Sequence, residues 1–367
     1  MDYTLEDLLR QMPVLKASDL HLRVGEPPVM RIHGDLERLD QYPVLTAENV
    51  VELCYAILNE RQKSRLETNL GLDLAHEVLG LARFRVNMFY QQACLGAVMR
   101  MIPINILTID ELGLPAALKA LALLPRGLIL VTGPTGSGKS TTLAAMVDHV
   151  NENQPLHVVT IEDPIEFVHN DKRCVIEQRE VGQDTSSFAE ALKHVVRATP
   201  DVILVGEMRD LETIALAITA AETGHLVFGT LHTTDAMQTV DRAVDVFPPQ
   251  QQQQIRMQLS VCLAAVISQS LLPVAGGGAR VPAFEIMICN PAIRAVIREG
   301  KTHMIYNLIQ AGRDDGMMAL DQYLADLVKA GTVDYELALS KSSYPNEFAK
   351  RCGSAAVIAE PPAAAGG

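Results

Sequence analysis

The sequence has 367 residues, of which 48% are hydrophobic and 20% charged, and its formal net charge at pH 7 is −13. This length predicts about two domains, and this composition excludes a chain that is disordered throughout. The acidic charge balance argues against a nucleic-acid partner, because affinity for phosphate backbones comes mainly from Lys and Arg. The absence of Trp and the low aromatic content of 4% argue against a surface that stacks bases.

The N-terminal segment and the cysteines indicate that the protein is not exported. Residues 1–12 are acidic and amphipathic, without the basic region and apolar run of a signal peptide. The longest uncharged stretch, 257–279, contains polar residues, Pro273 and three glycines, so it predicts a buried helix rather than a transmembrane segment. The six cysteines are scattered without a CxxC pair, which is typical of reduced thiols. We therefore predict a cytoplasmic protein.

Residues 1–102 predict a mixed α/β domain. An amphipathic helix is expected near the N-terminus, and a second helix around 50–58. Alternating apolar residues predict strands over 18–23, 28–33, 82–89 and 95–100. In the third of these strands, Arg83 and Arg85 share one face while apolar side chains occupy the other.

The pattern changes after this domain. Prolines bound a stretch of mixed composition, so we place a linker at 103–114. From 115 to 345 apolar strands alternate with helices, which predicts a parallel sheet that is buried on both faces. These strands are expected over 127–131, 157–161, 202–205 and 226–230. The chain becomes mostly helical after Gly278, and residues 346–367 are expected to form a flexible tail.

The strongest functional signal is the sequence GPTGSGKST, which follows an apolar strand and opens a helix. Its residues are Gly133, Pro134, Thr135, Gly136, Ser137, Gly138, Lys139, Ser140 and Thr141. This context confirms a phosphate-binding P-loop, in which glycines let backbone N–H groups surround phosphate oxygens. Lys139 is expected to reach the β- and γ-phosphates, and the Ser140 hydroxyl to bind Mg²⁺. The sequence therefore predicts a protein that binds a nucleoside triphosphate.

Two groups of acidic residues follow apolar strands at the same expected edge of the sheet. Glu207 follows the strand 202–205, and a carboxylate there lies beside the P-loop. It is expected to hold Mg²⁺ through water or to orient the attacking water. Glu162, Asp163 and Glu166 follow the preceding strand, and any of the three is a plausible activator of water. The residues alone do not decide which one is the base.

Two histidines bracket the strand 226–230. His225 and His232 are seven residues apart, so they are expected near opposite ends of the same strand. Their spacing alone favours structural or solvent-exposed histidines. Because no matching Cys or His residues stand nearby in the chain, the pair does not predict a metal site.

Together these motifs resemble the secretion ATPase superfamily, and within it the retraction motors of type IV pili. The resemblance runs from SDLHL near the N-terminus to about residue 345, and it includes TIEDPIEF, VGEMRDLET and TAAETGHLVFGTLHT. It implies an α/β fold with a PAS-like N-terminal domain, followed by a RecA-like P-loop ATPase core with a helical C-terminal region.

The resemblance also implies an activity and its partners. The activity is a hexameric motor that couples ATP hydrolysis to pilus retraction and twitching motility, with ATP and Mg²⁺ as ligands. The implied partners are further copies of the chain, a pilus platform protein in the inner membrane and a paralogous pilus ATPase. The implied location is cytoplasmic, and peripheral at the inner membrane when the motor engages the pilus machine.

Individual roles follow from the resemblance residue by residue. Glu166 matches the general base, and Glu207 matches the Walker B acid associated with Mg²⁺. The two residues of the histidine box correspond to His225 and His232. The arginines that the N-terminal domain offers to nucleotide correspond to Arg83, Arg85 and Arg100. Such arginines would offset the charge that develops in the transition state.

The sequence departs from the pattern of the retraction motors at two places. The segment AIRAVIRE at 292–299 has Ala295 and Val296 where relatives have Asn and Leu. The loop 197–201 reads RATPD where relatives usually carry Arg-Gln-Asp-Pro-Asp, so a polar contact is expected to be lost there. The chain lacks the additional N-terminal domain and four-cysteine zinc motif that are usual in extension ATPases, which favours retraction.

Two other functions stay open on the sequence. One is an accessory retraction ATPase that depends on a paralogue. The other is a nucleotide-binding switch with little turnover. The two departures from the family pattern are compatible with such a switch, whereas the intact acidic residues at the strand ends argue against it. A RecA-like DNA motor is disfavoured by the net charge of −13 and the scarce aromatic residues.

Overall fold

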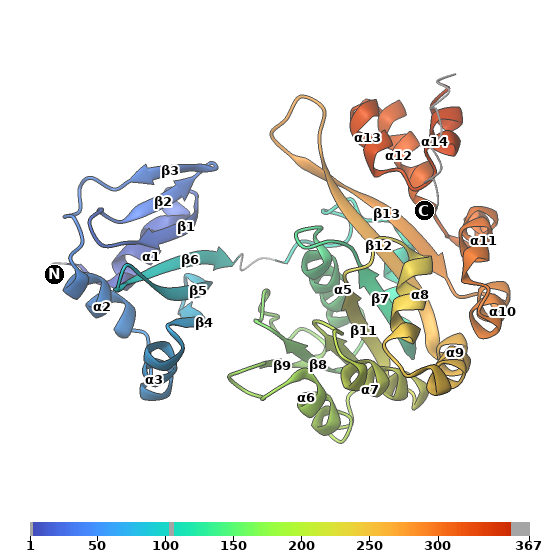
Figure 1. The fold of residues 1–367 in the computed structure, drawn as a ribbon, viewed down its shortest axis with the longest axis horizontal. Coiled ribbons are helices and arrows are strands. Elements are labelled where there is room, and N and C mark those ends of the chain that lie inside the picture. Colours follow the sequence, from blue (N-terminus) through green and yellow to red (C-terminus); the bar gives the residue numbers. More distant parts are fainter. Residues whose placement is uncertain (1–2, 103–105, 354–367) are drawn as a thin grey trace, which may run out of the picture. The chain divides into compact units, whose positions relative to one another are not determined.

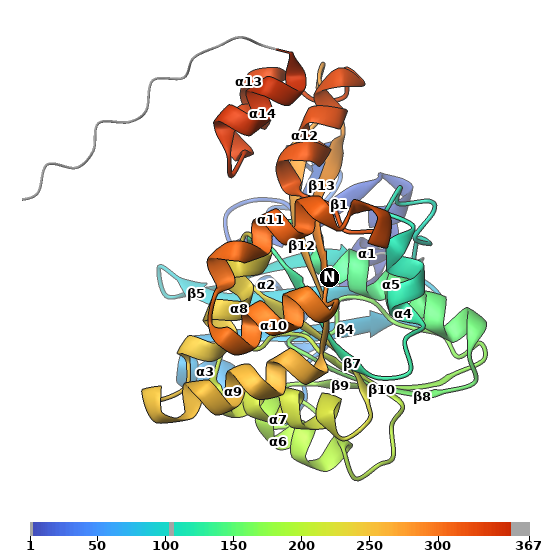
Figure 2. The ribbon, with the colours of Figure 1, turned by 90° about the vertical axis from the view of Figure 1, so that its right-hand side faces the viewer.

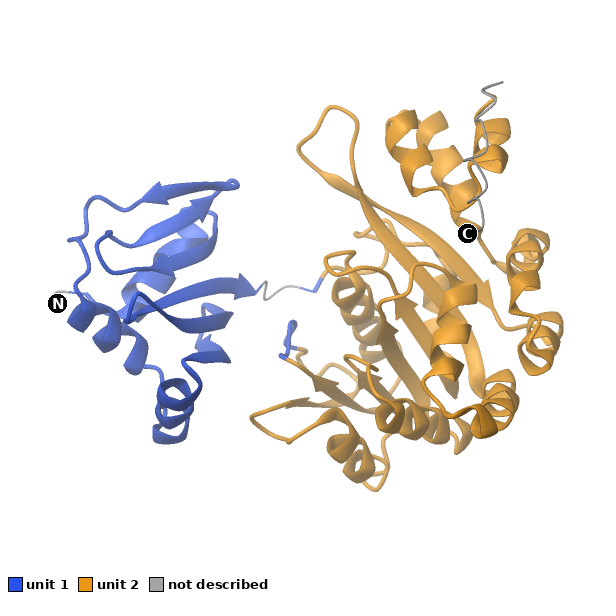
Figure 3. Cartoon of the chain, viewed as in Figure 1, with its two compact units in different colours: residues 1–106, 164–168 blue, residues 107–163, 169–367 orange. Residues whose placement is uncertain are grey.

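The computed structural model describes residues 3–102 and 106–353, which form two compact units. Unit 1 comprises residues 1–106 together with 164–168, and unit 2 comprises 107–163 and 169–367 (Figures 1 and 3). Residues 103–105 of the predicted linker and 354–367 of the predicted tail lie outside the described residues.

Unit 1 contains a six-stranded sheet with the strand order β3-β2-β1-β6-β5-β4. The strands are β1 (Ala17–Leu22), β2 (Val29–Ile32), β3 (Asp35–Arg38), β4 (Gly71–Val78), β5 (Ala82–Gln91) and β6 (Cys94–Ile102). The helices are α1 (Leu5–Val14), α2 (Ala47–Tyr55) and α3 (Glu60–Asn69). The predicted alternation in β5 is confirmed, because Phe84 and Val86 are fully buried whereas Arg85 is exposed.

Unit 2 contains a seven-stranded sheet with the order β13-β12-β7-β11-β10-β8-β9, in which only the β12–β13 pair is antiparallel. The strands are β7 (Gly127–Thr132), β8 (His157–Glu162), β9 (Val175–Glu180), β10 (Val202–Val205), β11 (Leu226–Leu231), β12 (Leu263–Pro273) and β13 (Arg280–Ile288). Every residue of β7, β10 and β11 is buried. The predicted parallel sheet, covered on both faces, is therefore confirmed.

Helices cover both faces of this sheet (Figures 1 and 2). They are α4 (Ala117–Ala122), α5 (Lys139–Asn153), α6 (Phe188–Val195), α7 (Leu211–Glu222), α8 (Ala236–Asp245), α9 (Pro249–Cys262), α10 (Pro291–Glu299) and α11 (Ile305–Ala311). Leu128 and Leu130 of β7 pack in one core cluster with α6 to α11, and Ile129 and Val131 pack in another with α4 and α5. Alternate residues of one strand thus serve two cores, as the period of two requires.

The C-terminal part of unit 2 is helical and carries a smaller core. Its helices are α12 (Leu320–Lys329), α13 (Tyr335–Lys341) and α14 (Pro345–Cys352), and short 3₁₀ turns precede them at Thr302–Met304 and Arg313–Asp315. The prediction of a flexible tail from residue 346 is wrong for 346–352, because α14 buries Phe348 completely against this core. Two apolar side chains in a short amphipathic segment, Phe348 and Ala349, were too weak a signal to predict the helix.

Two further predictions need correction. The stretch 257–279 is not one buried helix: α9 ends at Cys262, and β12 continues between β7 and β13. Short apolar runs do not distinguish helix from strand by periodicity, and tertiary pairing decides. Residues 107–114 are not part of a linker, since Ile109 and Leu114 are buried in the core beside α4 and α5.

Within 3–102 and 106–353, no helix combines the length and apolar character needed to cross a membrane.

Two buried carboxyl groups connect elements of unit 2 that are far apart in the sequence. Glu285 on β13 is 3% exposed, and one of its oxygens accepts the N–H of Ala236 at the start of α8 at 2.8 Å. Asp321 on α12 is fully buried and accepts from the hydroxyl of Tyr306 at 2.9 Å and from the N–H of Tyr344 at 3.1 Å. Burial raises the pKa of Glu285 to about 7, although the N–H of Ala236 acts in the opposite direction.

The raised pKa of Glu285 makes stability depend on pH. The folded protein holds this proton more tightly than the unfolded chain, so the free energy of unfolding falls as the pH rises from 4.5 to about 7. Glu285→Gln replaces the titrating carboxyl group with a neutral amide, which still has an oxygen that can accept the N–H of Ala236. We expect the variant to gain stability relative to the parent across this interval, by up to about 3 kcal/mol.

Thermal unfolding of parent and variant at pH 5 and pH 8 measures this gain. Glu60→Gln, at a side chain that is 90% exposed on α3, is the matched control. A difference in melting temperature between Glu285→Gln and the parent that is the same at both pH values would contradict the prediction.

Candidate nucleotide-binding and hydrolysis site

The predicted P-loop connects the buried strand β7 to helix α5. Gly133, Gly136 and Gly138 have φ angles of 141°, 78° and 92°, a region that favours glycine. Pro134, Thr135 and Gly136 are exposed, whereas Ser137 is buried. The helix begins at Lys139, so Ser140 and Thr141 lie in its first turn, where backbone N–H groups are without partners inside the helix. The loop therefore presents the polarity that binds phosphate.

Lys139 is folded over its own loop. Its ammonium group donates hydrogen bonds to the carbonyl oxygens of Gly133 at 2.8 Å and Pro134 at 3.1 Å. These contacts hold the ammonium group against the backbone of the loop, and its contact with phosphates stays a prediction.

Gln269 on β12 supports the P-loop, and the sequence did not identify it. Its amide oxygen accepts a hydrogen bond from the hydroxyl of Thr142 on α5 at 2.7 Å, and Gln269 is 4% exposed. Its backbone carbonyl approaches Gly133 so closely that a Cβ there would overlap with it, and a Cβ on Gly138 would lie 2.7 Å from its amide nitrogen. The available signal was a pair of polar residues, Ser268 and Gln269, inside an apolar run.

Strand register brings Glu207 and His232 to the edge of the sheet that carries the P-loop. Thr132 at the end of β7 pairs with Leu231 at the end of β11, so Gly133 and His232 leave the sheet side by side. The adjacent strand β10 ends at Val205, and Glu207 follows two residues later. Two hydrogen bonds tie this turn to β11: the Thr230 hydroxyl donates to Gly206 O at 2.5 Å, and Met208 N donates to Thr230 O at 3.1 Å.

Glu207, His232 and Arg209 form one polar group. Nε2 of His232 lies 2.6 Å from Oε1 of Glu207, and Nε of Arg209 donates to the same oxygen. The Glu207 side chain is 19% exposed. Burial raises the pKa of Glu207, but the hydrogen bonds from Arg209 and His232 outweigh it and hold the pKa below its usual value. Glu207 is therefore a carboxylate at neutral pH, and Arg209 and His232 are its partners in this structure.

His225 and the loop 197–201 lie at the other edge of the sheet. His225 precedes β11, and its Nδ1 lies 2.9 Å from the carbonyl oxygen of Ala220 near the end of α7. Because β11 is six residues long, about 20 Å of strand separates it from His232. The loop reaches the same edge, where Leu226 N donates to Asp201 O at 3.0 Å. Within one chain, the structure does not bring His225 to the P-loop, so its catalytic role stays a prediction.

The predicted acids after β8 are divided between the two units. Glu162 ends β8, and its Oε1 accepts the hydroxyl of Thr160 at 2.6 Å. Asp163 also belongs to unit 2, but Glu166 lies in the segment 164–168, which groups with unit 1. The role of Glu166 as the base therefore stays a prediction.

The three predicted arginines lie on neighbouring strands of unit 1. Arg85 on β5 pairs directly with Arg100 on β6, and Arg83 lies two residues away on β5. Nε of Arg100 donates to the buried Asp19 at 2.7 Å. Burial raises the pKa of Asp19, but Ser18 and Arg100 outweigh it and the pKa lies below its usual value. Asp19 therefore already offsets part of the positive charge on this face of the sheet, and the proposed contact of the three arginines with nucleotide stays a prediction.

This fold and site define a P-loop nucleoside-triphosphate-binding protein, with a phosphate-binding loop and a strand-end carboxylate at one edge of a parallel sheet. The chain belongs to the type II/IV secretion system protein family, whose model matches residues 4–316. The predicted fold class is confirmed by this match and by the structural comparison below.

The similar proteins include pilus ATPases. The chain is 54% identical to the type IV pilus retraction ATPase PilT of Pseudomonas aeruginosa, over 90% of this chain and 96% of PilT. It is 40% identical to the type IV pilus ATPase PilU of the same organism, over 94% of this chain and 90% of PilU. The crystal structure of the pilus retraction motor PilT with bound ADP matches with a TM-score of 0.89 and 47% identity, covering 94% of this chain and 98% of that one.

The close contact between Gly133 and Gln269 gives a prediction for nucleotide affinity. Gly133→Ala places a Cβ against the Gln269 backbone, which cannot move without displacing β12, so the loop must leave its observed conformation. We expect ADP affinity to fall at least about tenfold, which is about 1.4 kcal/mol.

Equilibrium titration with a fluorescent ADP analogue measures the change. Gly276→Ala is the control, because Gly276 also has a positive φ but a Cβ there meets nothing within 4 Å. Parental affinity in Gly133→Ala would show that the contact with Gln269 does not shape the loop.

Proposed function

We propose that the chain is an ATP-hydrolysing motor for type IV pilus retraction. The observation that carries the proposal is the meeting of the P-loop, Glu207 and His232 at one sheet edge, in a chain 54% identical to a pilus retraction ATPase. The motor would act in the cytoplasm, peripherally at the inner membrane, on a platform protein of the pilus machine.

Different residues of unit 2 would bind the phosphates and the Mg²⁺ ion. The P-loop N–H groups and Lys139 would hold the phosphates, because their polarity and position suit oxygen anions. Ser140 and Glu207 would hold Mg²⁺, the carboxylate through water. In the part of the chain that the structure describes, no group of three or more His, Cys, Asp or Glu side chains forms a metal site. A hydroxyl from Ser140 and a carboxylate from Glu207 fit Mg²⁺, which takes one or two protein oxygens together with phosphates and water. When bound, the ion neutralises charge on the phosphates.

The chemical step needs a base and positive charge. Glu166 would accept a proton from the attacking water, and His232 would orient Glu207 through their 2.6 Å contact. Arg83, Arg85 and Arg100 would stabilise charge on the transferred phosphoryl group. We assign these arginines to a neighbouring subunit of a homo-hexamer, so that the site is complete only at a subunit interface. Hydrolysis would then change the arrangement of the two units and produce movement.

Two alternatives differ from this proposal in turnover. An accessory ATPase that requires a paralogue, or a nucleotide-binding switch, would bind nucleotide and hydrolyse it slowly by itself. The greater identity to PilT than to PilU, 54% against 40%, supports the retraction motor.

Mg²⁺-ATP turnover per subunit, measured over a wide range of protein concentration, tests the proposal. We expect turnover to rise cooperatively with concentration, because the arginines come from a neighbouring copy. Glu166→Ala is expected to lower it by at least about a hundredfold. Arg126→Ala, at an exposed arginine outside the site, is the control.

The other outcomes separate the alternatives. Turnover that is independent of concentration would contradict a site shared between subunits. Nucleotide binding without turnover in the parent would favour the accessory ATPase or the switch.

A further inference from the structure

The acid-box segment, residues 163–168, leaves the sheet after β8 and returns at His169. It contains Glu166, four residues after Glu162 and three residues before His169. Three residues span at most about 11 Å, so the position of His169 strongly limits where Glu166 can go. The groups that fix the two ends of this segment are therefore candidates for residues that limit the position of Glu166.

Gln178 on β9 bridges the two ends. Its amide nitrogen donates to Oε1 of Glu162 at 3.1 Å, and its amide oxygen accepts the backbone N–H of His169 at 2.8 Å. Gln178 pairs with Thr160 in the β8–β9 register, and the Thr160 hydroxyl donates to the same oxygen of Glu162 at 2.6 Å. One side chain thus binds both the end of β8, at Glu162, and the returning chain, at His169.

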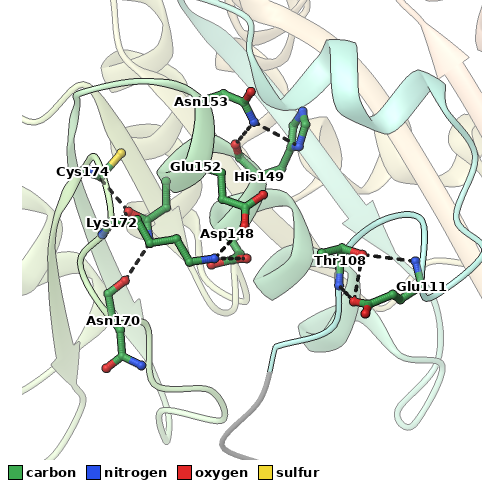
Figure 4. A network of polar contacts seen from close by, with 10 residues as sticks. Thr108, Glu111, Asp148, His149, Glu152, Asn153, Asn170, Lys172 and Cys174 are labelled. Carbon is green, nitrogen blue, oxygen red and sulfur yellow. Dashed lines mark hydrogen bonds and ion pairs between the residues drawn. The ribbon is translucent and has the colours of Figure 1, made fainter.

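The returning chain is also tied to helix α5, which begins in the P-loop. Asn151 is fully buried; its amide nitrogen donates to Asn170 O at 2.8 Å, and its amide oxygen accepts the N–H of Lys172 at 3.0 Å. The ammonium group of Lys172 binds Asp148 at 2.8 Å and Glu152 at 2.9 Å (Figure 4). The return of the acid-box segment is therefore held by the same helix that carries Lys139.

We propose that Gln178 is a positioning residue for ATP hydrolysis. By binding both ends of the acid-box segment, at Glu162 and at His169, it limits the positions that Glu166 can take. The inference rests on the proposed role of Glu166 as the base. Both polar atoms of the Gln178 amide are needed, because the nitrogen donates to a carboxylate and the oxygen accepts from a backbone N–H. Gln178 itself lies on a paired strand, so its backbone is fixed by the β8–β9 ladder.

Gln178→Met tests the proposal, since methionine keeps the length and most of the volume of the side chain and removes both hydrogen bonds. We expect kcat for ATP to fall by about tenfold to about a hundredfold, the cost of a small misplacement of a reacting group. The KM for ATP and the affinity for ADP are expected to stay at parental values, because the P-loop is unchanged. Gln252→Met on α9, which removes an amide hydrogen bond to Phe247 O, is the matched control.

Two further measurements separate positioning from a general loss of structure. Amide hydrogen exchange of 163–169 should become faster in Gln178→Met, while exchange in α5 and β8 stays as in the parent. In a Glu166→Gln background, Gln178→Met should lower the residual turnover no further, because Gln178 acts through Glu166.

The outcomes distinguish this inference from the proposal on which it rests. Parental kcat or parental exchange of 163–169 in Gln178→Met, with Glu166→Gln inactive, would overturn the role of Gln178 alone. Parental turnover in Glu166→Gln would overturn the role of Glu166 as the base. In that case hydrogen exchange would still show whether Gln178 closes the segment, but positioning of a base would be excluded.

Discussion

The register of the parallel strands β7, β11 and β10 is the constraint on which the site in unit 2 depends. Their carboxyl ends meet at one edge of the sheet, so the P-loop, His232 and Glu207 come together although they are far apart in the sequence. A shift of one residue in this register would move apolar side chains of a strand into the wrong core. The two cores that fix the sheet therefore also fix the site.

The same sheet connects the nucleotide-binding loop to the C-terminal helices. β12 touches the P-loop at Gln269, while Leu272, three residues later, packs in the core that contains Phe348 of α14. Helix α5 begins at Lys139 of the P-loop and carries Asn151, which holds the return of the acid-box segment. The P-loop is thus connected to the C-terminal core through β12 and to the return of the acid-box segment through α5.

The sequence predicted the features that depend on local pattern, and missed those that depend on tertiary pairing. Nine consecutive residues that follow an apolar strand and open a helix identify the P-loop, and the end of a strand identifies Glu207. Gln269 was missed because its contacts with Gly133 and Thr142 join segments more than a hundred residues apart. The stretch 257–279 predicts a helix, but the pairing of β12 with β7 and β13 outweighs this ambiguous local pattern. Which acid after β8 is the base could not be decided from spacing.

If the site is assembled as proposed, Glu207 and the P-loop act together on a metal–nucleotide complex. The measurement is the affinity for a non-hydrolysable ATP analogue with Mg²⁺ and with EDTA, in the parent and in Glu207→Gln. We expect Mg²⁺ to strengthen binding in the parent and the variant to lose most of this gain, while its affinity in EDTA stays parental. An equal gain from Mg²⁺ in both proteins would contradict the assignment of Glu207 to the nucleotide site.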